Sequence, residues 1–508
     1  LMGTEFVPKA DYSETTVSFY TPPGSSIEVT EAKAHQVESV LREFPEVRYT
    51  LTTINTGQAQ GRNYANVLVR LVDRRERKRS VDQMSVPMRE RLAAIPGITV
   101  THVGLLDSVG GAKPISLSVQ GDDLDELQRV SEQLSQKLRQ IPGLVDLDSS
   151  MKANKPTIDI TVKRDAAADL GLSVGTLTSV LRGLIAGQTV GTWRAPDDQS
   201  YDVNVRLAPE YRQNAKDIEN IGLVAGTNPD GSARIVRFNQ VATVTPGYGP
   251  TQINRRDLNR EVELTANVSG RAQGEVAADI RKAIVAANLP PTVSTSFGGS
   301  TKDMAESFSY ALSALALAII FIYMILASQF QSFLQPIALM SSLPLTLIGV
   351  VLTLILFGST LNMFSIIGVV MLMGLVTKNA ILLIDFAIRA RHGDVGDEPH
   401  GPPMAREAAL LLAARVRLRP ILMTTLAMVF GMVPLAFAIS EGSEQRAPMG
   451  QAVIGGVITS SLLTLVVVPV IYCYLDDLAS AFKRWFTKAP VAATSPVPAA
   501  PLPPATRD

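Results

Sequence analysis

Long runs without charge divide the chain into two parts. No Asp, Glu, Lys or Arg occurs from Ser307 to Thr377, from Ile421 to Ser440 or from Ala447 to Leu475. Each run reaches or exceeds the ~20 apolar residues that are needed to cross the hydrocarbon of a bilayer. Residues 1–306, in contrast, carry charges throughout. The pattern predicts an integral membrane protein with a large water-exposed head.

Polar and turn-forming residues at 328–331 and 358–360 subdivide the first run. We therefore predict five transmembrane helices. Their approximate limits are 307–327, 334–357, 363–388, 420–439 and 450–475.

Amphipathic stripes in the head indicate a repeated unit. Four times a helix-like stripe runs into a proline and then a strand-like segment: "LREFPEVRYTL", "LAAIPGITVTH", "LRQIPGLVDLD" and "VAANLPPTVSTS". Two such units in tandem make a split βαβ, ferredoxin-like module. Pro45 and Pro96 are 51 residues apart but Pro142 and Pro290 are 148 apart, so the second module holds about 97 inserted residues.

The predicted fold class is an α+β head followed by an all-α bundle of five transmembrane helices. The head has two ferredoxin-like βαβ modules, and a mixed α/β lobe interrupts the second. The expected limits are 1–109 for the first module, 110–155 and 248–300 for the second, 156–247 for the lobe, 301–480 for the membrane domain and 481–508 for a disordered Pro/Ala-rich tail.

Basic residues set the expected orientation. They cluster after the third span and after the fifth, and basic flanks mark the cytoplasmic side. This places the C-terminus in the cytoplasm and residues 1–306 outside it. Within this basic region, 404–418 is predicted to be a helix lying along the membrane surface. The basic residues are Arg389, Arg391, Arg406, Arg415, Arg417, Arg419, Lys483, Arg484 and Lys488.

Composition excludes several classes. The formal net charge is zero, which gives no argument for nucleic acid, and the single cysteine, Cys473, allows no intrachain disulfide. The four histidines lack metal-ligand spacing, and no phosphate-binding loop or hydrolase motif occurs, so we expect no metal, no cofactor and no enzyme. A head outside the cytoplasm requires an upstream targeting span. We therefore expect the sequence to be the C-terminal part of a longer polypeptide.

Lys378 is the candidate for a functional residue within the membrane helices. In "GLVTKNAILLIDF" it lies about fifteen residues from one end of its span and about ten from the other, near mid-bilayer at ~1.5 Å per residue. A charge at that depth favours a functional ion pair over the alternative, a lysine whose side chain extends to the membrane surface. Asp385, near the cytoplasmic end, is interpreted as a solvated end charge. The hydroxyls of Thr424 and Thr425 could simply bond back to their own helix.

Several motifs resemble the C-terminal half of a resistance–nodulation–division (RND) transporter, over residues 1 to about 485. They are "GTEFVPKADYSE", "SQFQSFLQPIALMSSLPLTLIGV", "GLVTKNAILLIDFA" and "RLRPILMTTLAMVFGMVPLA". The resemblance, closest to the hydrophobe/amphiphile efflux branch, implies a homotrimeric, proton-driven antiporter in the inner membrane of a Gram-negative bacterium. Such a pump exports drugs, dyes and detergents through a periplasmic adaptor protein and an outer-membrane channel. The implied keywords are transport, efflux and multidrug resistance.

The resemblance also implies a proton relay. In the family a lysine of the tenth span pairs with two aspartates of the fourth span, and Lys378 occupies its position. Asn379 follows the lysine in the family motif too, Thr424 matches the relay threonine, and Arg417 matches a basic residue on the approach to that span. The paired aspartates belong to the N-terminal half, which this sequence does not contain.

Two further interpretations concern substrate and class. Multidrug members place phenylalanines after the second strand, where this chain has Gln58, Gln60, Arg62, Asn63 and only Tyr64. This departure indicates a more polar or specialised substrate, although a solvated loop remains the alternative. A heavy-metal exporter is the second possibility, although Met84, Met88 and Met151 form no obvious cluster. A non-transporting, membrane-anchored periplasmic assembly module is the third.

Overall fold

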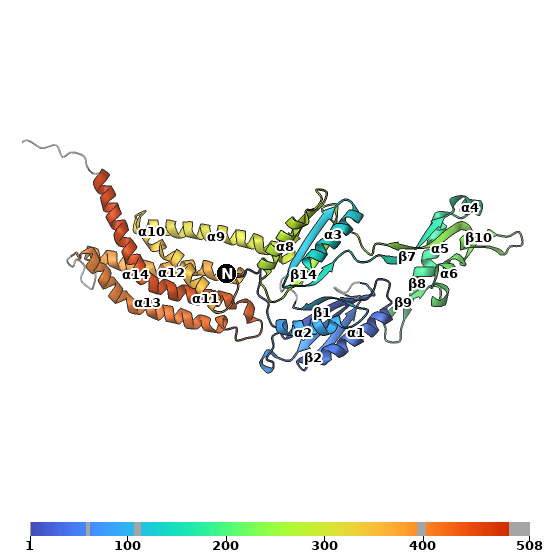
Figure 1. The fold of residues 1–508 in the computed structure, drawn as a ribbon, viewed down its shortest axis with the longest axis horizontal. Helices are drawn as coiled ribbons and strands as arrows, with labels where there is room; N and C mark the ends of the chain where they lie inside the picture. The colour runs from blue at the N-terminus through green and yellow to red at the C-terminus, as the bar shows by residue number, and fades with distance from the viewer. Residues whose placement is uncertain (1, 57–60, 106–112, 394–402, 487–508) are drawn as a thin grey trace, which may run out of the picture.

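The computed structural model describes residues 2–56, 61–105, 113–393 and 403–486. Membrane-type helices occupy one end of an elongated molecule, two sheet-containing modules lie in the middle, and a lobe forms the other end (Figure 1). The mixed α/β head and the five apolar helices agree with the predicted architecture.

The first module, residues 11–104, is a four-stranded antiparallel sheet with two helices. Its strands have the order β2-β3-β1-β4. Apolar side chains alternate along β3 and meet the stripe of α1, so that Val17, Val37, Leu41 and Val67 are fully buried. The elements are β1 (Glu14–Tyr20), α1 (Ile27–Arg42), β2 (Val47–Ile54), β3 (Tyr64–Leu71), α2 (Val81–Ala93) and β4 (Thr99–Gly104).

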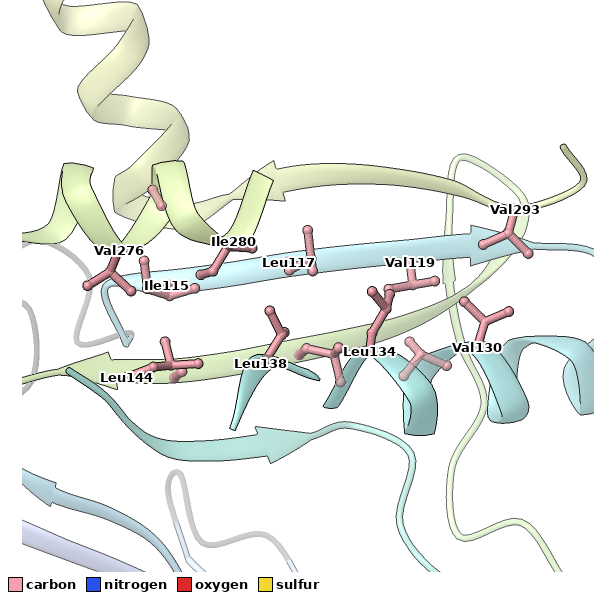
Figure 2. Packing of buried hydrophobic residues seen from close by; sticks show 14 of the residues in the cluster. Ile115, Leu117, Val119, Val130, Leu134, Leu138, Leu144, Val276, Ile280 and Val293 are labelled. Atoms are coloured by element: carbon pink, nitrogen blue, oxygen red, sulfur yellow. The ribbon is translucent and has the colours of Figure 1, made fainter. Parts of the chain in front are cut away.

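The second module is assembled from two separate stretches of the chain. β14 pairs with β5 and β6, and β15 pairs with the other edge of β5. Side chains from β5, α3 and α8 gather in its core, among them Leu117, Leu134 and Ile280 (Figure 2). The elements are β5 (Ile115–Gly121), α3 (Leu124–Leu138), β6 (Leu144–Ser149), β13 (Asn254–Arg256), β14 (Asn259–Val268), α8 (Gln273–Ala287) and β15 (Ser294–Gly298).

The lobe has its own apolar core, which includes Leu177, Leu223 and Phe238. β7 leaves the second module and pairs antiparallel with the returning β12 over their full length. The elements are β7 (Lys155–Val162), α4 (Arg164–Asp169), α5 (Val174–Leu181), a π-helical turn (Arg182–Ala186), β8 (Gln188–Arg194), β9 (Ser200–Val205), α6 (Ala215–Glu219), β10 (Gly222–Thr227), β11 (Ala233–Arg237), α7 (Phe238–Val241) and β12 (Ala242–Gly249).

Five helical segments of the described chain are long and apolar enough to cross a membrane. The first is α9, the second combines α10 and α11, and α12, α13 and α14 follow. Close packing of α11 on α14 depends on Gly455, because a Cβ built there would lie 2.6 Å from Gly349 O. The helices are α9 (Gly299–Phe330), α10 (Gln335–Met340), α11 (Ser342–Leu356), α12 (Met363–His392), α13 (Arg406–Ala436) and α14 (Ala447–Phe486).

Three predicted limits differ from the observed ones. α9 begins at Gly299, directly after β15, because the helix continues through charged residues that the apolar pattern did not count. Residues 406–418 are not a separate surface helix but the first part of α13, which runs on past Pro420. α14 extends to Phe486, beyond the expected start of the tail at 481, and the remainder of the tail lies outside the described residues.

Candidate functional site

Lys378 lies on an exposed stripe of α12. Met363, Ile367 and Met371 are 37, 43 and 37% exposed, and Gly374 and Lys378 continue the same face at helical spacing. Among the described residues, no hydrogen bond or ion pair involves the Lys378 side chain. A capping box between Asn362 and Ser365 fixes the first turn of α12. We call this face the Lys378 stripe.

Asn379 points the other way, into the helix bundle. It is 4% exposed, and its Nδ2 lies 3.5 Å from Ser461 Oγ on α14. Ser461 Oγ is 2.9 Å from Thr425 Oγ1 on α13. These buried polar contacts connect α12, α14 and α13, which makes the three helices one packed unit behind Lys378. Sequence reasoning missed Ser461; adjacent serines in a charge-free run were the only available signal.

Thr424 and Arg417 lie on α13 but do not touch Lys378. Thr424 is exposed, and its Oγ1 donates to Ile421 O at 3.0 Å, which is the local back-bond considered as the alternative. The Arg417 guanidinium lies 5.1 Å from the centre of the Phe386 ring on α12. In the described chain, no hydrogen bond or ion pair joins any two of these three residues.

Ion pairs hold Asp385 and the ends of α12, α13 and α14 that lie near it. Asp385 Oδ2 lies 2.9 Å from Arg389 Nη2, one turn further along α12, in agreement with a solvated end charge. Asp476 on α14 receives Arg391 from α12 at 3.1 Å and Arg406 from α13 at 3.2 Å. The same three helices are therefore tied together again at this end.

A second polar cluster joins the two modules. Asp146 on β6 of the second module receives Nε and Nη2 of Arg89 at 2.6 and 2.9 Å and Val103 N at 3.1 Å, both from the first module. Asn267 Nδ2 on β14 adds a bond at 2.7 Å. Burial opposes ionisation, but Arg89 and these donors hold the pKa of Asp146 below its usual value.

His102 belongs to this cluster as a neutral imidazole. Asn267 Nδ2 can only donate, so at 2.6 Å it requires His102 Nδ1 to accept, and Nε2–H then donates to Gly104 O at 3.0 Å. Burial lowers the pKa of His102 to about 4, against the opposing influence of Asp146. Protonation would place a donor opposite the Asn267 donor and break the inter-module bond.

The cluster predicts a specific pH dependence. His102 takes up a proton in the unfolded chain below its ordinary pKa of ~6.5, but in the folded chain only near 4. Its contribution to stability is therefore full above ~6.5 and is lost as the pH falls toward 4, about 1 kcal/mol between pH 7.5 and 5.5. Thermal unfolding of wild type and His102→Gln at both pH values measures it, with exposed His35→Gln as the control. An equal pH response of wild type and His102→Gln would refute the assignment.

The predicted substrate loop is only partly described. Gln58 and Gln60 lie outside the described residues, and Arg62 is exposed. The Tyr64 ring lies 5.5 Å from that of Tyr20, and Lys152 of the second module lies 4.5 Å over Tyr20. Burial, with the charge of Asp148, raises the pKa of Tyr64 to about 12. The loop therefore ends at an aromatic pair with a cation from the opposite module.

The methionines considered for metal binding do not form a site. Met84 and Met88 are fully buried in the core of the first module, and Met151 packs against the core of the second. Within the described ranges, no group of three or more His, Cys, Asp or Glu residues is placed to hold a metal ion.

Comparisons of the sequence and of the structure with known proteins all find similarity to efflux transporters. The pattern of the AcrB/AcrD/AcrF family matches residues 1–476. Multidrug resistance protein MdtC of Escherichia coli, in several strains, is 28% identical over 485 residues, 94% of this chain and 46% of MdtC. Two crystal forms of a heavy metal efflux pump share 25 and 26% identity with a TM-score of 0.80, over 94% of this chain and 49 and 48% of the pump. The chain spans about half the length of these relatives.

Proposed function

The chain belongs to the AcrB/AcrD/AcrF family of RND efflux transporters, and we propose that it forms the C-terminal half of a proton-driven exporter of amphiphilic or hydrophobic compounds. One observation carries the proposal. A lysine without a partner in the described chain lies within an apolar helix, on a face that this half leaves exposed, while the next residue is buried in the bundle. A transmembrane cation of this kind marks an ion or substrate pathway.

The proposed mechanism uses Lys378 as one member of a switchable ion pair. Two carboxylates from the fourth span of the N-terminal half would hold Lys378 while they are ionised. Protonation of a carboxylate would release it, giving two states that differ in the position of α12. Asn379, Ser461 and Thr425 support this role, because they connect α12 to α14 and α13. Thr424 and Arg417 on α13 are proposed as further relay residues.

The head is proposed to work in the periplasm. The order βαββαβ with strand order β2-β3-β1-β4 supports a ferredoxin-like first module, and the two-part second sheet supports the predicted domain limits. The basic residues at the C-terminal end of α12 and in the first half of α13 support the proposed orientation, with this side in the cytoplasm. We propose a homotrimer that passes substrate to a periplasmic adaptor protein and an outer-membrane channel, as the family resemblance implies.

The proposed substrate class rests on side chains that meet where the two modules face each other. The Tyr20–Tyr64 pair and Lys152 offer aromatic and cationic groups, which suit amphiphilic compounds with a polar or acidic group. A second candidate is export of metal ions, which the likeness to a heavy metal efflux pump favours. The burial of Met84 and Met88 in a core argues against a methionine site for soft metals.

Export by the complete transporter tests the proposal. Cells that produce it should accumulate less of a fluorescent dye than cells without it, and a protonophore should abolish the difference, because the proton gradient supplies the energy. Growth in graded zinc or copper, with the same cells, tests the second candidate. Increased metal tolerance without dye export would show that the transporter exports metal ions instead. Normal membrane levels with neither activity would favour a non-transporting anchor.

A further inference from the structure

Two carboxylates between α13 and α14 bind the first module. We call residues 437–446, which join these helices, the acidic loop. Glu441 Oε1 accepts from Ser13 Oγ at 2.9 Å and from Arg74 N at 3.2 Å. Glu444 forms an ion pair with the Arg74 guanidinium. The hydrogen bond from Arg74 N, then that from Ser13, lowers the pKa of Glu441 below its ordinary value, so this carboxylate is charged at neutral pH.

The loop meets a rigid part of the first module. Ser13 is fully buried with φ +56°, a conformation that a non-glycine residue adopts only when its surroundings hold it there. Asp11 supplies one restraint by accepting from Ser13 N at 3.0 Å and from Val81 N at 3.1 Å, and Arg77 pairs with it. Glu441 supplies another through the Ser13 hydroxyl. A displacement of Glu441 therefore displaces β1 and α2 as well, because hydrogen bonds connect them without a flexible segment between.

A steric contact supports the same junction. Gly442 has φ +75°, and a Cβ built on it would lie 2.2 Å from the Tyr12 ring. The loop thus touches the first module at Tyr12, Ser13 and Arg74, through a close contact, hydrogen bonds and an ion pair. These contacts come from sequence positions more than 360 residues apart.

The second module is attached to the membrane helices differently. α9 follows β15 without a break, and Gln273 Nε2 binds Ser300 and Thr301 at the start of α9, both at 3.1 Å. The segment before the first module contacts the second module and the membrane helices. Gly274 N on α8 donates to Thr4 O at 2.8 Å, and Glu5 N donates to Leu361 O, just before α12, at 3.1 Å. That segment continues into β1 of the first module while it is bound to α8 of the second, so both modules share it, whereas both carboxylates of the acidic loop bind the first module.

We propose that the acidic loop is the link through which α13 and α14 move the first module relative to the second. The inference rests on the proposed function. α13 carries Thr424 and Arg417, and Thr425 holds α13 to α14 through Ser461. When α13 and α14 shift near Thr424, Glu441 and Glu444 at the other end of this helix pair pull the first module with them. The second module stays attached to α9. The distance between Tyr20 of the first module and Lys152 of the second then changes.

Charge exchange in the complete transporter tests the link. Arg74→Glu and Glu444→Arg each place like charges opposite one another, and each should reduce dye export about tenfold, whereas the double exchange should restore most of it. Arg75→Glu is the matched control, because Arg75 is adjacent to Arg74 and has no partner in the described chain. Exposed ion pairs contribute little to stability, so protein levels should stay near normal. Single variants that export normally would overturn the link while leaving the proposed function intact.

A distance measurement separates movement from folding. Spin labels at Ser39→Cys on α1 and Gln136→Cys on α3, in a Cys473→Ser background, report the separation of the modules. In the otherwise unchanged transporter the distance distribution should shift between pH 7.5 and 5.5. The shift should vanish in Glu444→Arg and return in the double exchange. A shift that persists in Glu444→Arg would refute the link, and a wild type that exports no dye would refute the proposed function instead.

Discussion

Replacing Lys378 by alanine is expected to reduce export by the complete transporter to the level of cells that lack it. The variant removes the only charge within the central part of α12 and leaves an apolar stripe from Met363 onward. The carboxylates that we propose for the N-terminal half would lose their partner, so their protonation could no longer produce two positions of the helix. Dye efflux from energised cells, normalised to transporter in the membrane, gives the result.

Two controls make this result specific. Met371→Ala changes the same stripe without removing a charge and should export normally. Arg389→Ala removes a cation that is already paired with Asp385 near the C-terminal end of α12, and should also export nearly normally. Lys378→Arg keeps the charge but alters its shape, so partial activity is expected. Export by Lys378→Ala at wild-type rates and normal abundance would eliminate Lys378 as a relay residue.

Replacing Asp146 by alanine is expected to destabilise the head by about 3–5 kcal/mol. The Asp146 side chain is 3% exposed and pairs with Arg89 across the modules. Its loss leaves Arg89 without its carboxylate and removes the acceptor of Val103 N. The backbone adds to the effect, because Asp146 has φ +54° and alanine tolerates this conformation less well than aspartate or asparagine. Pulse proteolysis of purified transporter in increasing urea measures the change.

Asparagine at the same position separates charge from backbone. Asp146→Asn retains tolerance of the left-handed conformation and one acceptor oxygen, so its cost should be clearly smaller than that of alanine. Asp148→Ala, two residues along β6, removes a carboxylate that pairs with Lys152 at a more exposed position and should cost less still. Equal urea midpoints for Asp146→Ala and wild type would show that the cluster does not hold the modules together.

The membrane part was predictable because local composition determines it. The charge-free runs predicted all five apolar helices found among the described residues, and Lys378 was conspicuous as the charge that follows the longest run. The helix ends were less predictable. α9 passes through Lys302, Asp303 and Glu306, and α13 passes through Pro420 without a break, so neither charge nor proline ended the helix.

Contacts between distant segments could not be read from the sequence. Arg89 and Asp146 are 57 positions apart, and Asn267 is 121 positions from Asp146. Each residue alone has the appearance of an ordinary surface charge or amide, and His102 was one of four scattered histidines. The acidic loop gave no signal either, because carboxylates are expected in any turn between spans. Pairing in three dimensions, not residue type, gives these groups their roles.

The attachment of the lobe has a consequence for how such proteins diversify. Lys155 and Gly249 are Cα partners in the β7–β12 ladder, so the insertion leaves and re-enters the second module at one place. Its interior, built around Phe238 and Leu177, is separate from the interior of the module. The lobe is therefore an exchangeable cassette: any folded unit whose two ends lie side by side could replace it. A change in the surface at this end of the molecule therefore requires no change in the core of the second module.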